Sequence, residues 1–296
     1  MRIVVAGGTG FLGSALVDAL RRHGDHVIVL TRQPRRPDDL QWSTNNGGNL
    51  WKRALDEADA VINLAGEGIA DRRWTSARKN AILESRISAT RTIVSAIREA
   101  RPSPGVLINA SAIGIYGPHG DEPLTEDAAP GSDFLASVCT AWEREALVAS
   151  ATTRVVLLRS GLVLAKEGGA LPRIALPFRL FVGGPVGSGR QYMSWIHRDD
   201  WVSLVRWALS EHAVSGPLNL TAPEPVTNAE LARELGGALH RPSIVPAPGF
   251  ALRIVLGEMA EALLLSGQRV RPHKALVGGF AFQYATIESS LQAIYR

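Results

Sequence analysis

The chain has 296 residues, of which 46% are hydrophobic and 20% are charged, and its formal net charge is +4. These values are typical of a globular protein with one large domain, or one domain and a smaller appendage. The excess of arginine is modest and dispersed, which argues against a nucleic-acid-binding surface. The single cysteine, Cys139, excludes an intrachain disulfide and favours a reducing compartment. The longest apolar run, residues 251–265, contains three charged residues and is too short to span a bilayer, so we expect a cytoplasmic protein without a membrane partner.

Short apolar runs alternate with longer helical patterns through the first two-thirds of the chain. The runs are rich in β-branched residues and predict strands at residues 2–6, 26–30, 60–64, 106–110 and 155–158. The patterns between them predict helices at residues 11–22, 76–100 and 134–150. Strands that are apolar along their whole length are typical of a sheet covered on both faces. The order of the elements therefore predicts an α/β protein with a doubly wound, parallel-sheet Rossmann fold.

The character of the sequence changes after Leu164. Residues 166–190 are rich in Gly and Pro and predict long loops with room for one short helix, as is common in binding loops. Further on, we predict a helix at 199–210, a strand at 218–220, a helix from the capping box at Thr227 to about residue 239, and helices at 251–265 and 287–294. We therefore expect a Rossmann domain at residues 1–222, with a substrate-loop insertion at about 165–195, and a small C-terminal domain at 223–296 that serves as a substrate or lid region.

A glycine-rich turn follows the first predicted strand. Residues 4–17 read VVAGGTGFLGSALV, in which Gly7, Gly10 and Gly13 have the spacing GxxGxxG. In such a loop one glycine turns the chain, one lets the backbone approach a phosphate, and one lets the helix pack on the strand. The helix N-terminus then offers free N–H groups and a positive partial charge to a pyrophosphate. The pattern predicts a dinucleotide site, and a tight turn without a ligand is the alternative.

The end of the second predicted strand indicates which dinucleotide is bound. NAD sites place an acidic residue there against the ribose hydroxyls. This chain has LTRQPRR at residues 30–36, without a carboxylate. A guanidinium at Arg32 can pair with a 2′-phosphate and stack on the adenine. We therefore expect NADP(H) as the cofactor, with a solvated basic loop as the alternative.

Several motifs together resemble the extended short-chain dehydrogenase/reductase superfamily: the glycine loop, DAVINLAG at 59–66, SAIGIYG at 111–117 and WIHRDD at 195–200. More closely, LAGEGIADRRW at 64–74, GSGRQ at 187–191 and SGQRVRP at 266–272 resemble the atypical branch of sugar-nucleotide epimerase family proteins. That branch carries its own short C-terminal domain. The resemblance covers essentially the whole chain.

The resemblance also implies which residues bind the cofactor. The residues that would line the pyrophosphate are Gly7, Thr9, Gly10, Phe11 and Leu12. Those expected elsewhere on the cofactor are Arg32 at the 2′-phosphate, Leu64 and Ala65 on the adenosine side, Arg86 at a phosphate or ribose, and Leu162 at the nicotinamide end. From the residues alone, Leu64 and Leu162 are equally consistent with core packing. Arg86 lies among apolar positions of a predicted helix, where a salt bridge is the alternative to a cofactor contact.

The proton-transfer groups of the superfamily are missing. Working members use a Ser or Thr, a Tyr, and a Lys four residues after the Tyr, and the Lys lowers the pKa of the Tyr. None of the four tyrosines of this chain has a lysine four residues later. Laying the helix that begins at about residue 134 against the usual pattern puts Leu135 at the tyrosine position, Cys139 at the lysine position and Ala112 at the serine position.

Few residues remain as substitutes for these groups. Tyr116 follows a strand at the edge where open α/β sheets bind ligands, so it is our candidate catalytic residue, and packing against the substrate is the alternative. His197 and Asp199 form a pair that could move a proton or could simply cap a helix. The glycine-rich loop around Arg190 and Gln191 could close over a substrate phosphate or carboxylate, or could be a plain surface loop.

The sequence therefore leads to two functional hypotheses. The first is an NADP(H)-dependent epimerase-like or reductase enzyme that acts on a small carbonyl or sugar-derived substrate without the usual Ser-Tyr-Lys groups. The second is a catalytically silent NADP(H)-binding sensor. In either case we expect no metal, a small-molecule ligand and, as one option, a homodimer.

Overall fold

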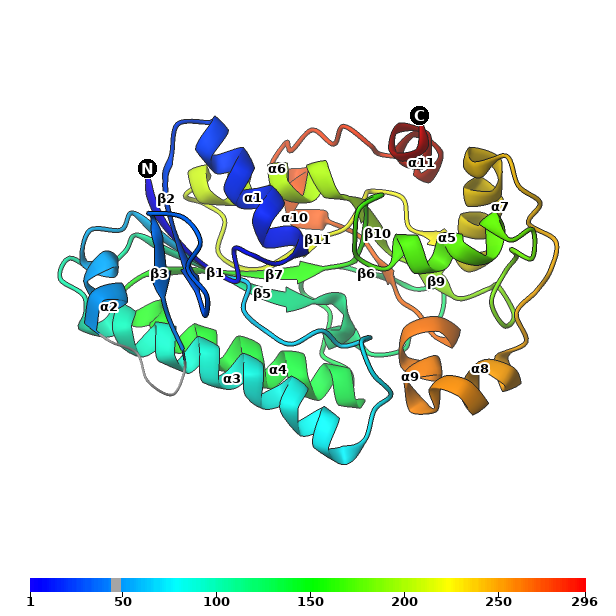
Figure 1. Cartoon of the computed structure of the whole chain (residues 1–296), viewed down its shortest axis with the longest axis horizontal. Coiled ribbons are helices and arrows are strands. Elements are labelled where there is room, and N and C mark those ends of the chain that lie inside the picture. The colour runs from blue at the N-terminus through cyan, green and yellow to red at the C-terminus, as the bar shows by residue number, and fades with distance from the viewer. Residues whose placement is uncertain (44–48) are drawn as a thin grey trace.

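The computed structural model describes residues 1–43 and 49–296, and Figure 1 shows their arrangement. A seven-stranded sheet lies at the centre, in the order β11-β7-β5-β4-β1-β2-β3, and its neighbouring strands run parallel. The strands are β1 (Arg2–Ala6), β2 (His26–Thr31), β3 (Asp39–Gln41), β4 (Ala60–Asn63), β5 (Val106–Ala112), β7 (Arg154–Ser160) and β11 (Gly216–Leu220). From β1 the chain adds strands on one side as far as β3 and then returns to the other side with β4. The predicted doubly wound, parallel-sheet Rossmann fold is therefore confirmed, with its switch point between β1 and β4.

Helices cover both faces of this sheet (Figure 1). They are α1 (Phe11–Arg22), α2 (Asn49–Asp56), α3 (Ser76–Glu99), α4 (Phe134–Leu147) and α6 (Arg198–Ser210). Side chains of alternate residues along β1 point to opposite faces, so Val5 packs with α1 and α6, whereas Val4 packs with α2, α3 and α4. The alternation explains why the strands are apolar along their whole length.

The C-terminal part of the chain adds short elements around the edge of the sheet. The strands are β6 (Pro123–Leu124), β8 (Leu162–Leu164), β9 (Tyr192–Met193), β10 (Trp195–His197), β12 (Val226–Thr227) and β13 (Arg269–Val270). The helices and turns are η1 (Ile113–Tyr116), η2 (Val148–Ala151), α5 (Leu171–Arg179), α7 (Asn228–Leu239), α8 (Gly249–Leu256), α9 (Glu258–Ala260), η3 (Glu261–Leu265), α10 (His273–Val277) and α11 (Ile287–Tyr295). Leu171, Leu231 and Leu291 bring α5, α7 and α11 into one apolar cluster. The helix inside the glycine-rich insertion therefore packs with the C-terminal helices.

The observed bounds differ from the expected ones mainly near the C-terminus. The prediction of one helix over residues 251–265 is wrong, because the chain turns sharply between α8 and α9. Gly257 has φ +63° at this turn, a conformation that is costly for residues with a side chain. The capping box predicted for α7 is present, with Thr227 Oγ1 accepting from the Glu230 amide and the Glu230 carboxylate accepting from the Thr227 amide.

Two properties of the described residues bear on the partners expected from the sequence. Among residues 1–43 and 49–296, no helix has the length and apolar character needed to cross a bilayer. The same residues hold no group of three or more His, Cys, Asp or Glu side chains placed to bind a metal ion. The cytoplasmic location stays a prediction.

Candidate functional site

The glycine turn after β1 lies directly against the end of β4. Gly7 has φ +77°, and a Cβ added to it would lie 2.7 Å from the carbonyl carbon of Leu64 and 2.9 Å from the amide nitrogen of Ala65. A Cβ on Gly13 would lie 2.1 Å from the carbonyl oxygen of Gly7, so α1 can pack on the turn only because residue 13 is glycine. The Leu64 amide donates to the Ala6 carbonyl at 2.9 Å and holds the two chain segments together. The glycine loop thus meets the Leu64–Ala65 backbone at the switch point of the sheet.

The N-terminus of α1 is left open at this edge. Gly10 is the N-cap residue and has no side chain to accept from the amides of the first turn. Those amides have no partner inside the helix, so they can serve an anionic ligand. Thr9 and Gly10 are exposed, while Phe11 and Leu12 are half-buried. The structure therefore brings the residues expected to line a pyrophosphate together in one turn.

The Phe11 side chain also links the turn to the segment that follows β8. A Cβ added to Gly168 would lie 2.5 Å from the Phe11 ring, and one added to Gly169 would lie 2.9 Å from it. The two glycines therefore let the chain pass close over the ring. A polar groove of about 830 Å³ begins at Phe11 and runs between α1 and α6 toward Arg22 and Arg206. Because its walls are mostly the outer surfaces of these two helices, we do not assign the cofactor to this groove.

Arg32 is placed as the sequence predicts, immediately after β2, and its side chain is exposed. Within the part of the chain that the structure describes, this guanidinium has no ion-pair or hydrogen-bond partner. Nearby, the backbone amides of Arg35 and Arg36 donate to the Asp39 carboxylate at 2.8 and 3.0 Å. Asp39 is thus occupied in shaping the loop, and Arg32 remains available for an anion.

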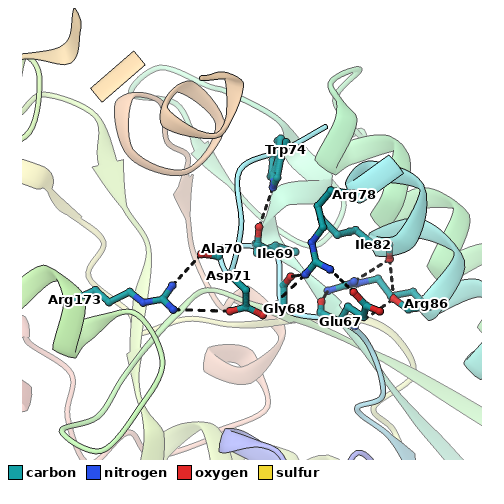
Figure 2. Close-up of polar contacts among 11 residues, drawn as sticks. Glu67, Gly68, Ile69, Ala70, Asp71, Trp74, Arg78, Ile82, Arg86 and Arg173 are labelled. Carbon is teal, nitrogen blue, oxygen red and sulfur yellow. Dashed lines mark hydrogen bonds and ion pairs between the residues drawn. The ribbon is translucent and has the colours of Figure 1, made fainter. Parts of the chain in front are cut away.

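Arg86 on α3 lies beside the end of β4 and is mostly enclosed (Figure 2). Its Nη1 donates to the Ile82 carbonyl at 2.9 Å and its Nη2 donates to the Glu67 carbonyl at 3.0 Å. The guanidinium carbon lies 5.1 Å from the centre of the Trp142 ring. Burial lowers the pKa of Arg86, although the nearby charge of Glu67 acts in the opposite direction. The Glu67 carboxylate pairs with Arg78 instead. The salt bridge expected as the alternative is therefore not formed between Arg86 and any described residue, and an enclosed cation faces the strand edge.

The segment between β4 and α3 is fastened on both sides, as Figure 2 shows. Arg78 donates to the Glu67 carboxylate and to the Gly68 carbonyl. On the other side, Arg173 of α5 donates to the Ala70 carbonyl at 2.9 Å. The Trp74 indole donates to the Ile69 carbonyl at 2.8 Å. Hydrogen bonds thus hold residues 67–71 to α3 on one side and to α5 on the other, at the carboxyl end of β4.

A buried amide network that the sequence analysis missed supports this edge. Asn63 and Asn109 are register partners on β4 and β5. The Asn63 side-chain amide donates to the Asn109 side-chain carbonyl at 2.7 Å and to the Thr90 hydroxyl at 2.9 Å. The Trp142 indole donates to the same hydroxyl at 2.9 Å. The available signal was an asparagine at the same place in two apolar strands, AVIN and VLIN, because buried amides occur where they are paired.

Tyr116 lies in a different environment from the one expected of a catalytic phenol. Its side chain is 0% exposed. The hydroxyl donates to Asn219 Oδ1 at 2.7 Å and accepts from Arg159 Nη1 at 2.9 Å. Burial raises the pKa of this phenol. The hydroxyl is thus fully engaged inside the protein, which gives no support to proton donation to a ligand.

Arg159 is the centre of an ion-pair network that the sequence analysis also missed. Its Nε and Nη2 donate to the two carboxylate oxygens of Glu143, each at 2.9 Å, and both side chains are buried. Ser111 donates to the same carboxylate at 2.7 Å. The Arg159 Nη1 also donates to the Glu126 carbonyl at 3.0 Å. The pair joins β7 to α4 and satisfies its charges internally.

The residues aligned with the missing proton-transfer groups gather near the end of β5. Cys139 packs in one cluster with Ala112 and Tyr116. Leu135 lies beside Gly114, since a Cβ on this glycine would be 3.3 Å from the Leu135 Cβ. Burial raises the pKa of the Cys139 thiol to about 12. None of these three side chains can exchange a proton near neutral pH.

The remaining candidates are fixed by local structure. His197 caps α6, with its Nδ1 accepting from the Asp199 amide at 3.1 Å, and burial lowers the pKa of this imidazole. In the glycine-rich loop, the Gln191 side-chain amide donates to the carbonyls of Val186 and Leu264 at 3.0 and 2.7 Å. Arg190 is exposed, and Leu162 is half-buried on β8. His197 thus serves to cap α6, and Gln191 serves to anchor the glycine-rich loop.

Comparison with known proteins agrees with the fold. The model of the NAD dependent epimerase/dehydratase family matches residues 3–220, and that of a domain of unknown function, DUF1731, matches residues 247–294. An epimerase family protein of Mycobacterium leprae is 41% identical over 98% of this chain and 94% of its own length.

Two solved structures extend these matches. The human epimerase family protein SDR39U1, crystallised with NADPH, is 35% identical with a TM-score of 0.93, over 100% of this chain and 99% of that one. A nucleoside-diphosphate sugar epimerase of Corynebacterium glutamicum is 32% identical with a TM-score of 0.82, over 100% of this chain and 59% of that one. The resemblance seen in the motifs is thus confirmed, and the chain belongs to the NAD dependent epimerase/dehydratase family, in the branch that ends in a DUF1731 domain.

Proposed function

We propose that the chain binds NADP(H) across the carboxyl ends of β1 and β4. The observation that carries this proposal is the approach of Gly7 to the Leu64 backbone beside the uncapped N-terminus of α1. A side chain at residue 7 would collide with that backbone, and the first-turn amides would receive the pyrophosphate. The human relative crystallised with NADPH supports the choice of ligand.

Arg32 would select the phosphorylated cofactor. Its exposed guanidinium has no partner among the described residues and follows the second strand directly. Paired with a 2′-phosphate, it would form charge-assisted hydrogen bonds, which contribute about 1.5–3 kcal/mol when the group is charged. The affinity for NADPH would then exceed that for NADH by at least about tenfold.

Arg86 would supply a fixed positive charge to the ribose or a phosphate of the cofactor. Its guanidinium lies between Gly66, just after β4, and Trp142 on α4, which is one helical turn from Cys139. Cys139 stands where the resembling superfamily has its lysine. Arg86, a cation on α3, would therefore lie close to the place where those enzymes have a lysine on the helix that corresponds to α4. It would orient the cofactor but would have no tyrosine to activate.

The function that this arrangement supports best is an NADP(H)-dependent, epimerase-like or reductase activity on a small carbonyl or sugar-derived compound. The nicotinamide, when bound, would supply hydride chemistry. The glycine turn and Arg86 would hold the cofactor, and residues 67–71 would cover the end of β4. We assign Tyr116 a structural role, because its hydroxyl is enclosed between Asn219 and Arg159.

A second candidate function, a silent NADP(H)-binding sensor, is favoured by one specific observation. The positions of the usual proton-transfer groups hold Ala112, Leu135 and Cys139, whose side chains form part of the apolar packing near β5. A protein that only reports cofactor state needs no acid or base there.

Two measurements test the proposal. Calorimetric titration should show tighter binding of NADPH than of NADH, and Arg32→Ala should remove the difference, whereas Arg98→Ala, an exposed arginine on α3, should leave it unchanged. Equal affinities in the unaltered protein would refute the cofactor assignment. Turnover of carbonyl compounds and nucleotide sugars, followed at the nicotinamide absorbance, then separates the two functions: NADPH binding without turnover of any of them identifies the sensor.

A further inference from the structure

Three arginines converge on residues 67–71, and each holds one backbone carbonyl of this segment. Arg78 and Arg86 come from α3, and Arg173 comes from α5. Arg86 donates at 3.0 Å and Arg173 at 2.9 Å, while Arg78 donates to a carbonyl between theirs. Figure 2 shows Arg78 between the other two. We call these three side chains the arginine row, which begins beside the proposed cofactor site at Arg86 and leads to α5.

Positive charges outnumber negative ones around this segment. The Glu67 carboxylate pairs with Arg78, which leaves Asp71 as the only other acidic residue between β4 and α3. The two residues after Asp71 are exposed arginines that form no ion pair with a described residue. The charged residues are Arg72, Arg73, Arg78, Arg86 and Arg173 against Glu67 and Asp71, and a neighbouring pair, Lys79 with Glu258, is neutral. The excess of positive charge favours an anionic ligand.

Asp71 lies between two members of the arginine row without a hydrogen bond to either. Its Oδ1 is 3.9 Å from Arg173 Nη2, and its Oδ2 is 4.0 Å from Arg78 Nη2. Both distances are too long for hydrogen bonds, and the Asp71 side chain is 59% exposed. A Cβ on Gly68 would lie 2.2 Å from the Asp71 Oδ2, so a carboxylate fits here only because residue 68 is glycine. The segment therefore leaves a place for an oxyanion, and Asp71 fills it loosely.

Both arginines keep donors for a ligand at this place. Arg173 is 66% exposed and uses its Nη1 on the backbone. The Nε of Arg78 is buried and has no hydrogen-bond partner among the described residues. A guanidinium carries five N–H donors in a fixed plane, which suits a carboxylate or a phosphate. A ligand oxyanion can thus form the charge-assisted hydrogen bonds that Asp71 does not form.

We propose that Arg78 and Arg173 bind a carboxylate or phosphate group of the substrate, which displaces the Asp71 carboxylate from between them. The inference rests on the proposed function, because it is the cofactor site beside Arg86 that makes this place a substrate subsite. A substrate whose reacting carbon meets the nicotinamide would extend its anionic group along the arginine row toward α5. The substrate class is therefore acidic: a carbonyl or sugar-derived compound that carries a phosphate or a carboxylate.

Binding of inorganic phosphate and of acetate to the NADPH complex tests the subsite, because bound NADPH occupies the anion-binding positions of the cofactor site. Thermal melting at constant ionic strength gives a dissociation constant for each anion. In Asp71→Asn the constant of the tighter-binding anion should fall at least about threefold, because a competing charge is removed. In Arg173→Gln it should rise about tenfold. Tighter binding of phosphate would indicate a phosphorylated substrate, and tighter binding of acetate a carboxylic acid.

Two variants control for charge alone. Glu211→Gln removes a negative charge after α6, near Arg154 at the start of β7, and Arg98→Gln removes an exposed arginine near the end of α3. Neither should change the constants. The proposal is overturned if neither anion binds, if Asp71→Asn and Arg173→Gln leave the constants unchanged, or if the controls shift them equally. Failure of NADPH to bind refutes the proposed function instead, and the same titrations of the free protein then decide whether the subsite exists.

Discussion

The central sheet has two pairs of carboxyl ends to compare: those of β1 and β4, which form the first edge, and those of β5 and β7, which form the second edge. The polar groups at the two edges differ in whether they have partners inside the protein. At the first edge, the amides of α1 lack a capping side chain and Arg86 has no ion pair with a described residue. At the second edge, Arg159, Glu143 and the Tyr116 hydroxyl satisfy one another inside the protein. The difference indicates that the first edge is built to receive an anionic ligand, while the second is built to hold the fold together.

The largest expected effect comes from breaking the internal network at the second edge. In Arg159→Ala, Glu143 would remain buried without its partner, and we expect the free energy of unfolding to fall by about 3–5 kcal/mol. Urea denaturation followed by circular dichroism measures this change. Arg91→Ala is the matched control, because Arg91 also pairs with a glutamate of α4, Glu145, but at the surface, and it should change stability little. Equal effects of the two substitutions would contradict the distinction.

The next effect should appear at the first edge, in ligand affinity. In Gly7→Ala the new Cβ would collide with the Leu64 backbone, so the turn or the end of β4 must move. We expect the affinity for NADPH, measured by calorimetry, to fall at least about a hundredfold, or about 2.7 kcal/mol. Gly24→Ala controls for backbone strain alone, since Gly24 has φ +93° but no atom within 4 Å of its added Cβ. Unchanged NADPH binding in Gly7→Ala would mean that the turn does not hold the cofactor.

A smaller effect locates Arg86 along the cofactor. Arg86→Gln removes the charge but keeps hydrogen-bonding capacity, and we expect NADPH affinity to fall about tenfold. The probe adenosine 2′-phosphate 5′-diphosphate lacks both the nicotinamide and the ribose that carries it. If Arg86 acts at the nicotinamide ribose, the substitution should weaken NADPH more than this probe. Equal weakening of both ligands would place Arg86 at the pyrophosphate or adenosine end instead.

The smallest effect should follow removal of the Tyr116 hydroxyl. Tyr116→Phe leaves Asn219 and Arg159 each short of one partner, and we expect a loss of about 1–2 kcal/mol of stability without a change in NADPH affinity. Tyr284→Phe is the comparison, because its hydroxyl accepts from the exposed Gln283 and from no other described residue. Any turnover that is found should survive in Tyr116→Phe. A loss of turnover by about a hundredfold or more would restore the phenol as an acid/base group.

The parts of the fold that depend on local spacing could be predicted from the sequence. The glycine turn, β1 and α1 follow one another within a few residues, and the bounds expected for β1 and α1 match the structure. The parallel sheet follows from the alternation of apolar runs and helices. The capping box of α7 is likewise a four-residue pattern.

The features that depend on distant contacts could not be predicted in the same way. The pairing of Glu143 with Arg159 joins a helix to a strand, and nothing in either local pattern identifies the partner. The burial of Tyr116 depends on Asn219, 103 residues away. The break of the expected 251–265 helix depends on the conformation of Gly257, since apolar residues lie on both sides of it and continue the helical pattern.

The contact of Phe11 with Gly168 and Gly169 has a consequence for mutational tolerance. Any side chain at position 168 would push on an aromatic ring more than 150 positions earlier in the chain, on the first residue of α1. A substitution in the segment after β8, which looks like an unconstrained surface connection, would therefore displace Phe11 beside the glycine turn. Such a substitution would need a compensating change at residue 11.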